Sequence, residues 1–266
     1  MAMPYVDFGD ERLYYSDWDG DSEDALPPLV LIHGAGGSHL HWPSHMRRLR
    51  GIDVHALDLP GHGHSRGHGR TTISAYRDLV LGWSEAISLR PFVLAGHSMG
   101  GAIAQDFALH YPDRLAGLVL VGSGARLRVH PAILQGVQED FPATAKLIAD
   151  WAHGATASDK SRRQYLRRLL EVDPSVLLGD FQACNAFDVM GQLSEISVPS
   201  LAICGTADRL TPPKYSEYLQ DQIPDGRLFM VEGAGHMVML EKPAEVAAAA
   251  TDFLQEVGAQ RHEIGE

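Results

Sequence analysis

The sequence of 266 residues is poor in cysteine and lacks any targeting or membrane segment that we recognise. Its two cysteines, Cys184 and Cys204, are too few for a disulfide framework and lack the clustered spacing of a zinc site. The N-terminus has no basic segment followed by an apolar stretch, and no run approaches the roughly 18 apolar residues of a spanning helix. We therefore expect two buried thiols and a cytoplasmic protein without membrane insertion.

Positive charge is also scarce, because 22 Lys and Arg residues stand against 34 Asp and Glu residues, for a net charge of −12. This balance disfavours a protein whose task is to neutralise the phosphates of a nucleic acid or to bind an anionic membrane. The rest of the composition, 45% hydrophobic and 21% charged, is that of an ordinary globular protein. We expect a small-molecule partner and no nucleic acid, and the sequence leaves the oligomeric state open.

Short apolar runs that end in glycine-rich or polar turns follow one another along the chain. Residues 5–18 mix aromatic and acidic side chains around Gly9, which suits a strand, a turn and a second strand at a sheet edge. The later runs are apolar on both faces and therefore predict strands that are covered by helices on both sides. These runs occupy residues 29–34, 53–61, 92–98, 115–124, 200–205 and 227–233.

Segments with helical spacing lie between these strands, at residues 73–87 and 101–110, and a closing helix is predicted over residues 244–257. Strands that alternate with helices predict the α/β class and a mostly parallel sheet. A chain of this length is long enough to form one such domain with an insertion.

Residues 126–195 interrupt the alternation, because they contain no convincing strand and their apolar positions recur at helical intervals. We predict that this segment is a helical cap, inserted into a core made of residues 1–125 and 196–266. The alternative is that the helices of this segment pack on the sheet as a further part of the core. That alternative is disfavoured because a strand-free segment of this length is too long to be one connection in the alternation of strands and helices.

The strongest chemical signal is the serine at the centre of Gly96-His97-Ser98-Met99-Gly100-Gly101, which follows an apolar strand and opens a helix. Glycines two residues before and after Ser98 permit a sharp strand-to-helix turn that exposes the hydroxyl at the carboxyl end of the strand. The free N–H groups of the helix also favour negative charge at this point. The pattern predicts that Ser98 is a nucleophile.

A serine hydroxyl needs a base, and the base needs a partner that fixes its tautomer. Asp208 follows the strand at residues 200–205, and His236 lies in a glycine-flanked loop after the last strand. The carboxyl ends of parallel strands meet at one crevice, and the order Ser, Asp, His suits this chemistry. We predict a triad of Ser98, Asp208 and His236 over the alternatives of a turn aspartate and a surface histidine.

The sequence His33-Gly34-Ala35-Gly36-Gly37 follows the first buried strand, where backbone must approach a substrate closely. Two peptide N–H groups are needed to bind the oxygen of a tetrahedral intermediate, and we predict those of Met99 and Ala35. A purely structural glycine-rich connector is the alternative. The sequence leaves open whether Gly36 replaces Ala35 as the donor.

Taken together, five motifs of the chain resemble those of the α/β-hydrolase superfamily, and most closely those of its small esterases, lactonases and cofactor-free perhydrolases. The motifs are HGAGG, DLPGHGHS, GHSMGG, the GTAD aspartate and the GAGH histidine. The resemblance implies an eight-stranded, mostly parallel sheet flanked by helices, the triad named above, and a cap whose inner face shapes the substrate pockets. Superfamily members with an aspartate nucleophile are disfavoured by Ser98.

No cofactor or metal is expected. His62, His64 and His68 are close together, with His55 upstream, but the glycines around them form a loop that the superfamily uses structurally. The histidines therefore favour a structural role over a metal site.

The predicted function is hydrolysis of a carboxylic ester of a small, mainly apolar substrate through an acyl-enzyme on Ser98. An ester is preferred to an amide only because of the resemblance. Lactone opening, carbon–carbon bond hydrolysis and peracid formation remain open on the same triad, and a non-catalytic ligand receptor is a further alternative. For substrate binding we predict Trp42, Phe141 and Trp151.

Overall fold

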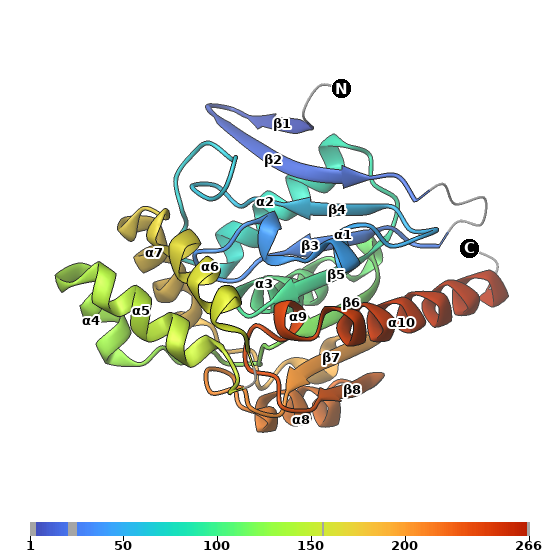
Figure 1. The fold of residues 1–266 in the computed structure, drawn as a ribbon. Coiled ribbons are helices and arrows are strands. Elements are labelled where there is room, and N and C mark those ends of the chain that lie inside the picture. Colours follow the sequence, from blue (N-terminus) through green and yellow to red (C-terminus); the bar gives the residue numbers. More distant parts are fainter. Residues whose placement is uncertain (1–3, 21–25, 156, 265–266) are drawn as a thin grey trace.

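The computed structural model describes residues 4–20, 26–155 and 157–264, so the outermost residues of the predicted core lie outside the described residues. An eight-stranded sheet crosses the molecule in the order β1-β2-β4-β3-β5-β6-β7-β8 (Figure 1). The pairs β1–β2 and β2–β4 are antiparallel, and all other neighbours are parallel. The predicted α/β fold with a mostly parallel sheet is therefore confirmed. The strands are Tyr5–Phe8, Glu11–Trp18, Leu29–Ile32, Val54–Leu57, Phe92–His97, Leu115–Val121, Ser200–Gly205 and Gly226–Val231, from β1 to β8.

Both faces of the central sheet are covered, which explains why β3, β5, β6 and β7 are buried at every position and are mostly apolar. In β3, Leu29 and Leu31 point to one face and pack in a cluster that includes α1 and α10. Val30 and Ile32 point to the other face and pack in a cluster that includes α2 and α3. The helices outside the predicted cap are α1 (Ser44–Arg47), α2 (Ile73–Ala86), α3 (Met99–His110), α8 (Pro213–Gln222), α9 (Val238–Glu241) and α10 (Pro243–Ile264), with 3-10 turns η1 (His39–His41) and η2 (Pro112–Arg114).

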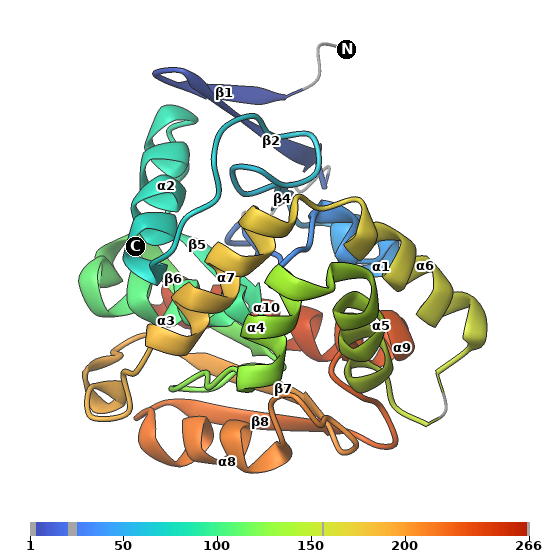
Figure 2. The ribbon, with the colours of Figure 1, turned by 90° about the vertical axis from the view of Figure 1, so that its left-hand side faces the viewer.

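The chain between β6 and β7 forms a group of helices, which we call the cap segment (residues 126–195). Its described residues contain four helices and no strand, although an isolated bridge pairs Arg126 with Asp188 at its base. Figures 1 and 2 show these helices together at one end of the sheet, the end toward which the carboxyl ends of the parallel strands point. They are α4 (Pro131–Glu139), α5 (Phe141–Ala152), α6 (Asp159–Leu170) and α7 (Pro174–Ala186), followed by the 3-10 turn η3 (Leu193–Glu195).

Several strands end earlier than their apolar runs predicted. β3 ends at Ile32, and the following residues His33 and Gly34 already belong to a loop. β6 ends at Val121, because Gly122 adopts a positive φ of 53° that an extended strand does not allow. The predicted strand residues beyond these points form loops at the end of the sheet that faces the cap segment. None of the helices in the described part of the chain is both long and apolar enough to cross a membrane.

Candidate active site

Ser98 lies at a strained turn between β5 and α3, with φ of 53° and ψ of −113°. A positive φ is unusual for serine, and such strain persists only where the surroundings enforce it. The flanking glycines explain how the turn is accommodated. A Cβ atom at Gly96 would lie 2.0 Å from the Gly100 carbonyl oxygen, and one at Gly100 would lie 2.3 Å from that of Ile32. The turn therefore requires glycine at both positions.

Hydrogen bonds hold the backbone of the turn on both sides of the serine. The Ser98 N–H donates to the Val121 carbonyl at 2.9 Å, which ties the turn to β6. The Ser98 carbonyl accepts from the Gly101 N–H at 2.9 Å and from Ser123 Oγ at 2.8 Å. Ser123 was not predicted from the sequence. Its place just after β6 brings it against the start of α3, where it reinforces the turn.

Asp208 and His236 are in direct contact, as their positions after β7 and β8 predicted. His236 Nδ1 lies 2.9 Å from Asp208 Oδ2, and both side chains are almost completely buried. Asp208 Oδ1 accepts the N–H groups of Leu210 and Thr211, each at 2.9 Å. A carboxylate accepts, so Nδ1 must carry the proton, and Nε2 is then the nitrogen that faces away from Asp208.

The environment of Asp208 keeps it ionised. Burial acts to raise the pKa of the Asp208 carboxyl, but the neighbouring His236 and the hydrogen bonds from His236 and Thr211 outweigh burial and lower this pKa below its usual value. An anionic Asp208 stabilises the imidazolium that forms when His236 takes a proton.

Thr211 and His97 surround this pair and were missed in the sequence. Thr211 Oγ1 donates to Asp208 Oδ2 at 2.8 Å and lies 3.1 Å from His236 Nδ1. His97 Nε2 donates to the His236 carbonyl at 3.0 Å, and the two rings lie 4.7 Å apart. Burial and the nearby His236 hold the pKa of His97 well below its usual value, so this imidazole stays neutral. A threonine three residues after the aspartate was the available signal for Thr211, because such residues satisfy turn aspartates.

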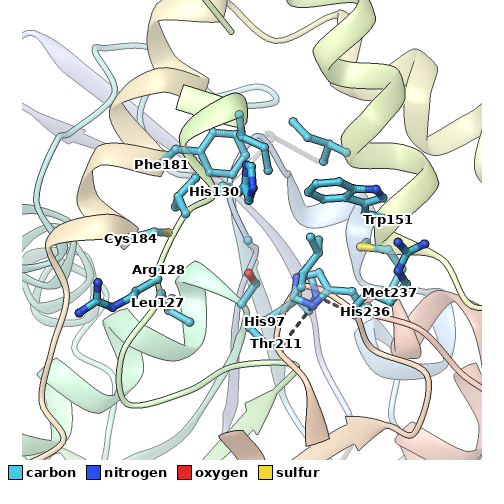
Figure 3. Close-up of a pocket in the computed structure, with 18 of the residues that line it drawn as sticks. His97, Leu127, Arg128, His130, Trp151, Phe181, Cys184, Thr211, His236 and Met237 are labelled. Atoms are coloured by element: carbon cyan, nitrogen blue, oxygen red, sulfur yellow. Dashed lines mark hydrogen bonds between the residues drawn. The ribbon is translucent and has the colours of Figure 1, made fainter. Parts of the chain in front are cut away.

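Ser98 and His236 line one cavity of about 240 Å³, between the sheet and the cap segment. Figure 3 shows His236 and Thr211 at its base, with Trp151 and Phe181 above them. Most of the side chains that the cap segment contributes to the cavity wall are apolar. Arg128 is an exception, but it is exposed and its guanidinium points away from the centre of the cavity (Figure 3). The cavity can therefore hold an apolar group next to the serine hydroxyl. The aliphatic, Trp and Phe side chains that the cap segment contributes are Leu127, Val129, Ile133, Ile148, Trp151 and Phe181.

The loop after β3 reaches the same cavity, where Gly34 and Ala35 form part of the wall. The Gly36 N–H is already used, because it donates to Asp180 Oδ2 of α7 at 2.8 Å. Within the described residues, the N–H groups of Ala35 and Met99 donate to no protein group. The Gly36 N–H is thus engaged, whereas the Ala35 N–H is not.

The predicted substrate-binding residues divide into one that reaches the cavity and two that do not. Trp151 of α5 lines it, whereas Trp42 and Phe141 are absent from its wall. Trp42 is fully buried in the core between η1 and α1, and its edge borders a separate groove beside α6. Phe141 begins α5 and packs against the core cluster instead. Trp42 and Phe141 therefore do not border this cavity, and Tyr165, Phe181 and Tyr215 are aromatic residues of its wall that the sequence did not reveal.

The histidines of the DLPGHGHS loop have structural contacts. His62 Nε2 donates to Asp180 Oδ2 at 2.8 Å, and the backbone N–H of His64 donates to Asp58 Oδ2 at 2.8 Å. Asp58 also accepts the N–H and the ring of His39, so it joins this loop to the loop after β3. Throughout the described ranges, no group of three or more His, Cys, Asp or Glu side chains has the arrangement of a metal site.

A serine on a strained strand-to-helix turn, with a buried Asp–His pair at the same end of a mostly parallel sheet, defines a serine hydrolase of the α/β type. The sequence matches the family described as "Alpha/beta hydrolase family" over residues 29–249. The chain belongs to this family, which confirms the resemblance seen in its motifs.

Relatives and solved structures agree with this assignment. The pimeloyl-acyl-carrier protein methyl ester esterase of Yersinia enterocolitica is 30% identical over 247 residues, which cover 86% of this chain and 93% of that protein. A thermophilic esterase of known structure is 31% identical, with a TM-score of 0.83, and the match covers 96% of this chain and 98% of that chain. The enol-lactonase from Burkholderia xenovorans LB400 shares the fold, with a TM-score of 0.87 at 24% identity over 95% of this chain and 100% of that chain. The esterases bear out the prediction of a serine-type ester hydrolase.

Proposed function

We propose that the protein hydrolyses a carboxylic ester in two steps on Ser98, His236 and Asp208. In the first step, Ser98 Oγ attacks the ester carbonyl while His236 Nε2 takes its proton, and the protonated imidazole then donates to the departing alcohol. In the second step, water loses a proton to His236 and attacks the acyl-enzyme, and His236 returns the proton to Ser98 Oγ as the acid leaves. The observation that carries this proposal is the 2.9 Å contact of Asp208 with His236 beside the cavity that Ser98 lines.

The oxyanion that forms in both steps is bound by the N–H groups of Met99 and Ala35. Met99 is the first residue of α3, so its N–H has no partner within the helix and benefits from the positive end of the helix dipole. The engagement of the Gly36 N–H with Asp180 supports Ala35 as the second donor. Loss of one such donor typically costs about 3 kcal/mol of transition-state stabilisation.

The substrate is a small ester with a short or medium acyl chain, which the cap segment helps to enclose. A cavity of about 240 Å³ with an apolar wall suits an uncharged acyl group of this size. His41, which also lines the cavity, is held neutral because burial lowers its pKa to about 3. A small alcohol portion is consistent with the methyl ester that the relatives' name specifies.

The location and partners are further parts of the proposal. We assign the protein to the cytoplasm, where Cys184 and Cys204, both buried free thiols, are stable in reduced form. Burial raises the pKa of Cys204 to about 12, which makes that thiol unreactive. The partner is a small ester and not a nucleic acid.

Turnover of p-nitrophenyl butyrate by the wild-type protein and by Ser98→Ala tests the proposal. We expect release of p-nitrophenol by the wild-type protein and a loss of at least about 10⁴-fold in kcat for Ser98→Ala, on the pattern of other serine hydrolases. Acyl lengths from acetate to octanoate and a simple lactone should be compared in the same assay. Equal rates for the two proteins at every length would contradict ester hydrolysis at Ser98.

A further inference from the structure

Asp180 is an acidic residue in the middle of the cap helix α7, yet its side chain is completely buried. Burying a carboxylate is costly unless hydrogen bonds and a positive charge compensate. Three donors meet it, and all three belong to the core. They are the Gly36 N–H at 2.8 Å and His62 Nε2 at 2.8 Å, both on Oδ2, and the Tyr76 hydroxyl at 2.6 Å on Oδ1.

His62 supplies the compensating positive charge. Its Nδ1 lies 3.0 Å from the Pro60 carbonyl and its Nε2 lies 2.8 Å from Asp180. A carbonyl and a carboxylate are both acceptors, so both ring nitrogens must carry protons. Burial acts to lower the pKa of His62, but the charge and hydrogen bond of Asp180 outweigh burial and raise this pKa above its usual value. The neighbouring His33 stays neutral, because burial lowers its pKa to about 4 and its Nε2 accepts the Leu59 N–H.

The loop that contains Gly36 is held by the cap helices in a second way. Gly36 has a positive φ of 62°, and a Cβ atom there would lie 2.7 Å from Leu177 and 2.8 Å from Leu169. Helices α6 and α7 therefore pack directly on the backbone next to Ala35. The Ala35 carbonyl and the Gly36 N–H belong to one planar peptide unit, so this unit cannot rotate while the Gly36 N–H keeps its acceptor.

We propose that Asp180, paired with His62, is a positioning residue that holds the loop after β3 so that the Ala35 N–H points at the reacting oxygen. This inference rests on the proposed ester hydrolysis at Ser98. Asp180 does not touch the cavity wall, and it acts through the peptide between Ala35 and Gly36. The cap segment therefore contributes to catalysis as well as to the enclosure of the substrate.

The test replaces Asp180 by asparagine and measures kcat, KM and the melting temperature with p-nitrophenyl butyrate. Asn keeps the size of the side chain but lacks the negative charge that pairs with His62, and its amide nitrogen, at either carboxylate position, faces a group that donates to Asp180 in the wild-type protein. The substitution loosens the loop but does not remove the Ala35 N–H. We therefore expect kcat to fall about 10-fold to 100-fold, which is no more than the fall expected when a whole oxyanion donor is lost. KM should change by less than about threefold, because the apolar wall is unchanged.

Two matched variants separate positioning from stability. Tyr76→Phe removes a hydrogen bond from the same carboxylate without touching Gly36, so it should lower the melting temperature while kcat stays within about threefold. Asp173→Asn makes the same chemical change at the exposed start of α7, where Asp173 bonds only within its own helix, and should leave both quantities unchanged. A fall in kcat that simply follows the melting temperature across these variants would overturn the inference.

If the Asp180→Asn variant does not fold, a second variant still tests the inference. His62→Gln then removes the positive partner but keeps Asp180, and a kcat reduced severalfold at constant KM supports the inference, whereas an unchanged kcat overturns it. A wild-type protein that hydrolyses the ester through Ser98, together with a folded Asp180→Asn variant of full kcat, would refute only the positioning role. Absence of Ser98-dependent turnover in the wild-type protein would instead refute the proposed function.

Discussion

The Asp208 carboxylate is the group on which the orientation of His236 depends. Its two oxygens accept four hydrogen bonds, from the backbone N–H groups of Leu210 and Thr211, from Thr211 Oγ1 and from His236 Nδ1. A carboxylate with this many donors is fixed in position before any substrate binds. The histidine tautomer is therefore a consequence of the turn after β7.

Asp208→Asn should preserve the fold and lower kcat by about 10⁴-fold, because an amide NH₂ facing Nδ1 favours the wrong histidine tautomer. Steady-state kinetics together with far-UV circular dichroism would measure both effects. Thr211→Val is a useful comparison, since it removes one hydroxyl contact and leaves the carboxylate. Near-wild-type kcat in folded Asp208→Asn would show that another group orients His236.

At the residue scale, the sequence predicted residues that lie in recognisable motifs, such as Ser98 and His236. It did not predict the residues that support them, such as Thr211 and Asp180. Ser98 and His236 are embedded in glycine-rich motifs, and such motifs are local in the sequence. Asp180 has no motif, and its role depends on contacts with Gly36 and His62, more than one hundred positions away. Its only signal was an acidic residue close to the apolar Leu177 and Phe181 on α7.

The junction of β5 and α3 is the element that positions Ser98. The strand is buried at every position and the helix begins directly after Ser98, so all the bending occurs at one residue. Close approach of the two backbones at Gly96 and Gly100 makes this possible. The geometry of the turn therefore depends on the absence of a Cβ atom two residues before and two residues after Ser98.

Gly96→Ala tests this account of the turn. A Cβ atom 2.0 Å from a backbone oxygen forces the backbone to move, so we expect a loss of about 3 kcal/mol or more and a melting temperature lower by roughly 6–12 °C. Gly191→Ala is the matched control, because a Cβ atom there meets nothing within 4 Å. Differential scanning calorimetry of the two variants measures the effect, and equal melting temperatures would contradict the steric argument.

At the element scale, the central strands were predictable because buried parallel strands form apolar runs, whereas the edge pair β1–β2 was predicted from its mixed residues around the turn at Gly9. Strand ends were less predictable, since an apolar run does not reveal where a glycine such as Gly122 turns the chain. The aromatic lining was also unpredictable. Trp42 and Trp151 are the same residue type, but only the tertiary packing of the segment that carries each one decides which reaches the cavity.

The whole molecule brings together segments that are far apart in the chain. Ser98, Asp208 and His236 follow β5, β7 and β8, and the parallel sheet places the carboxyl ends of these strands on one side. The cap segment is inserted between β6 and β7, so it lies over the same end and encloses the site (Figure 2). The meeting of these three residues and their cover by the cap segment are thus both consequences of the sheet topology.

The most direct test of the central claim is covalent labelling of the wild-type protein with a fluorophosphonate, followed by peptide mass spectrometry. The account predicts one phosphonyl group per chain on Ser98, none on Ser98→Ala, and labelling slowed at least about 100-fold in His236→Ala, because the base that activates the hydroxyl is gone. An adduct on a different residue, or full ester hydrolysis by a protein whose Ser98 remains unlabelled, would contradict it.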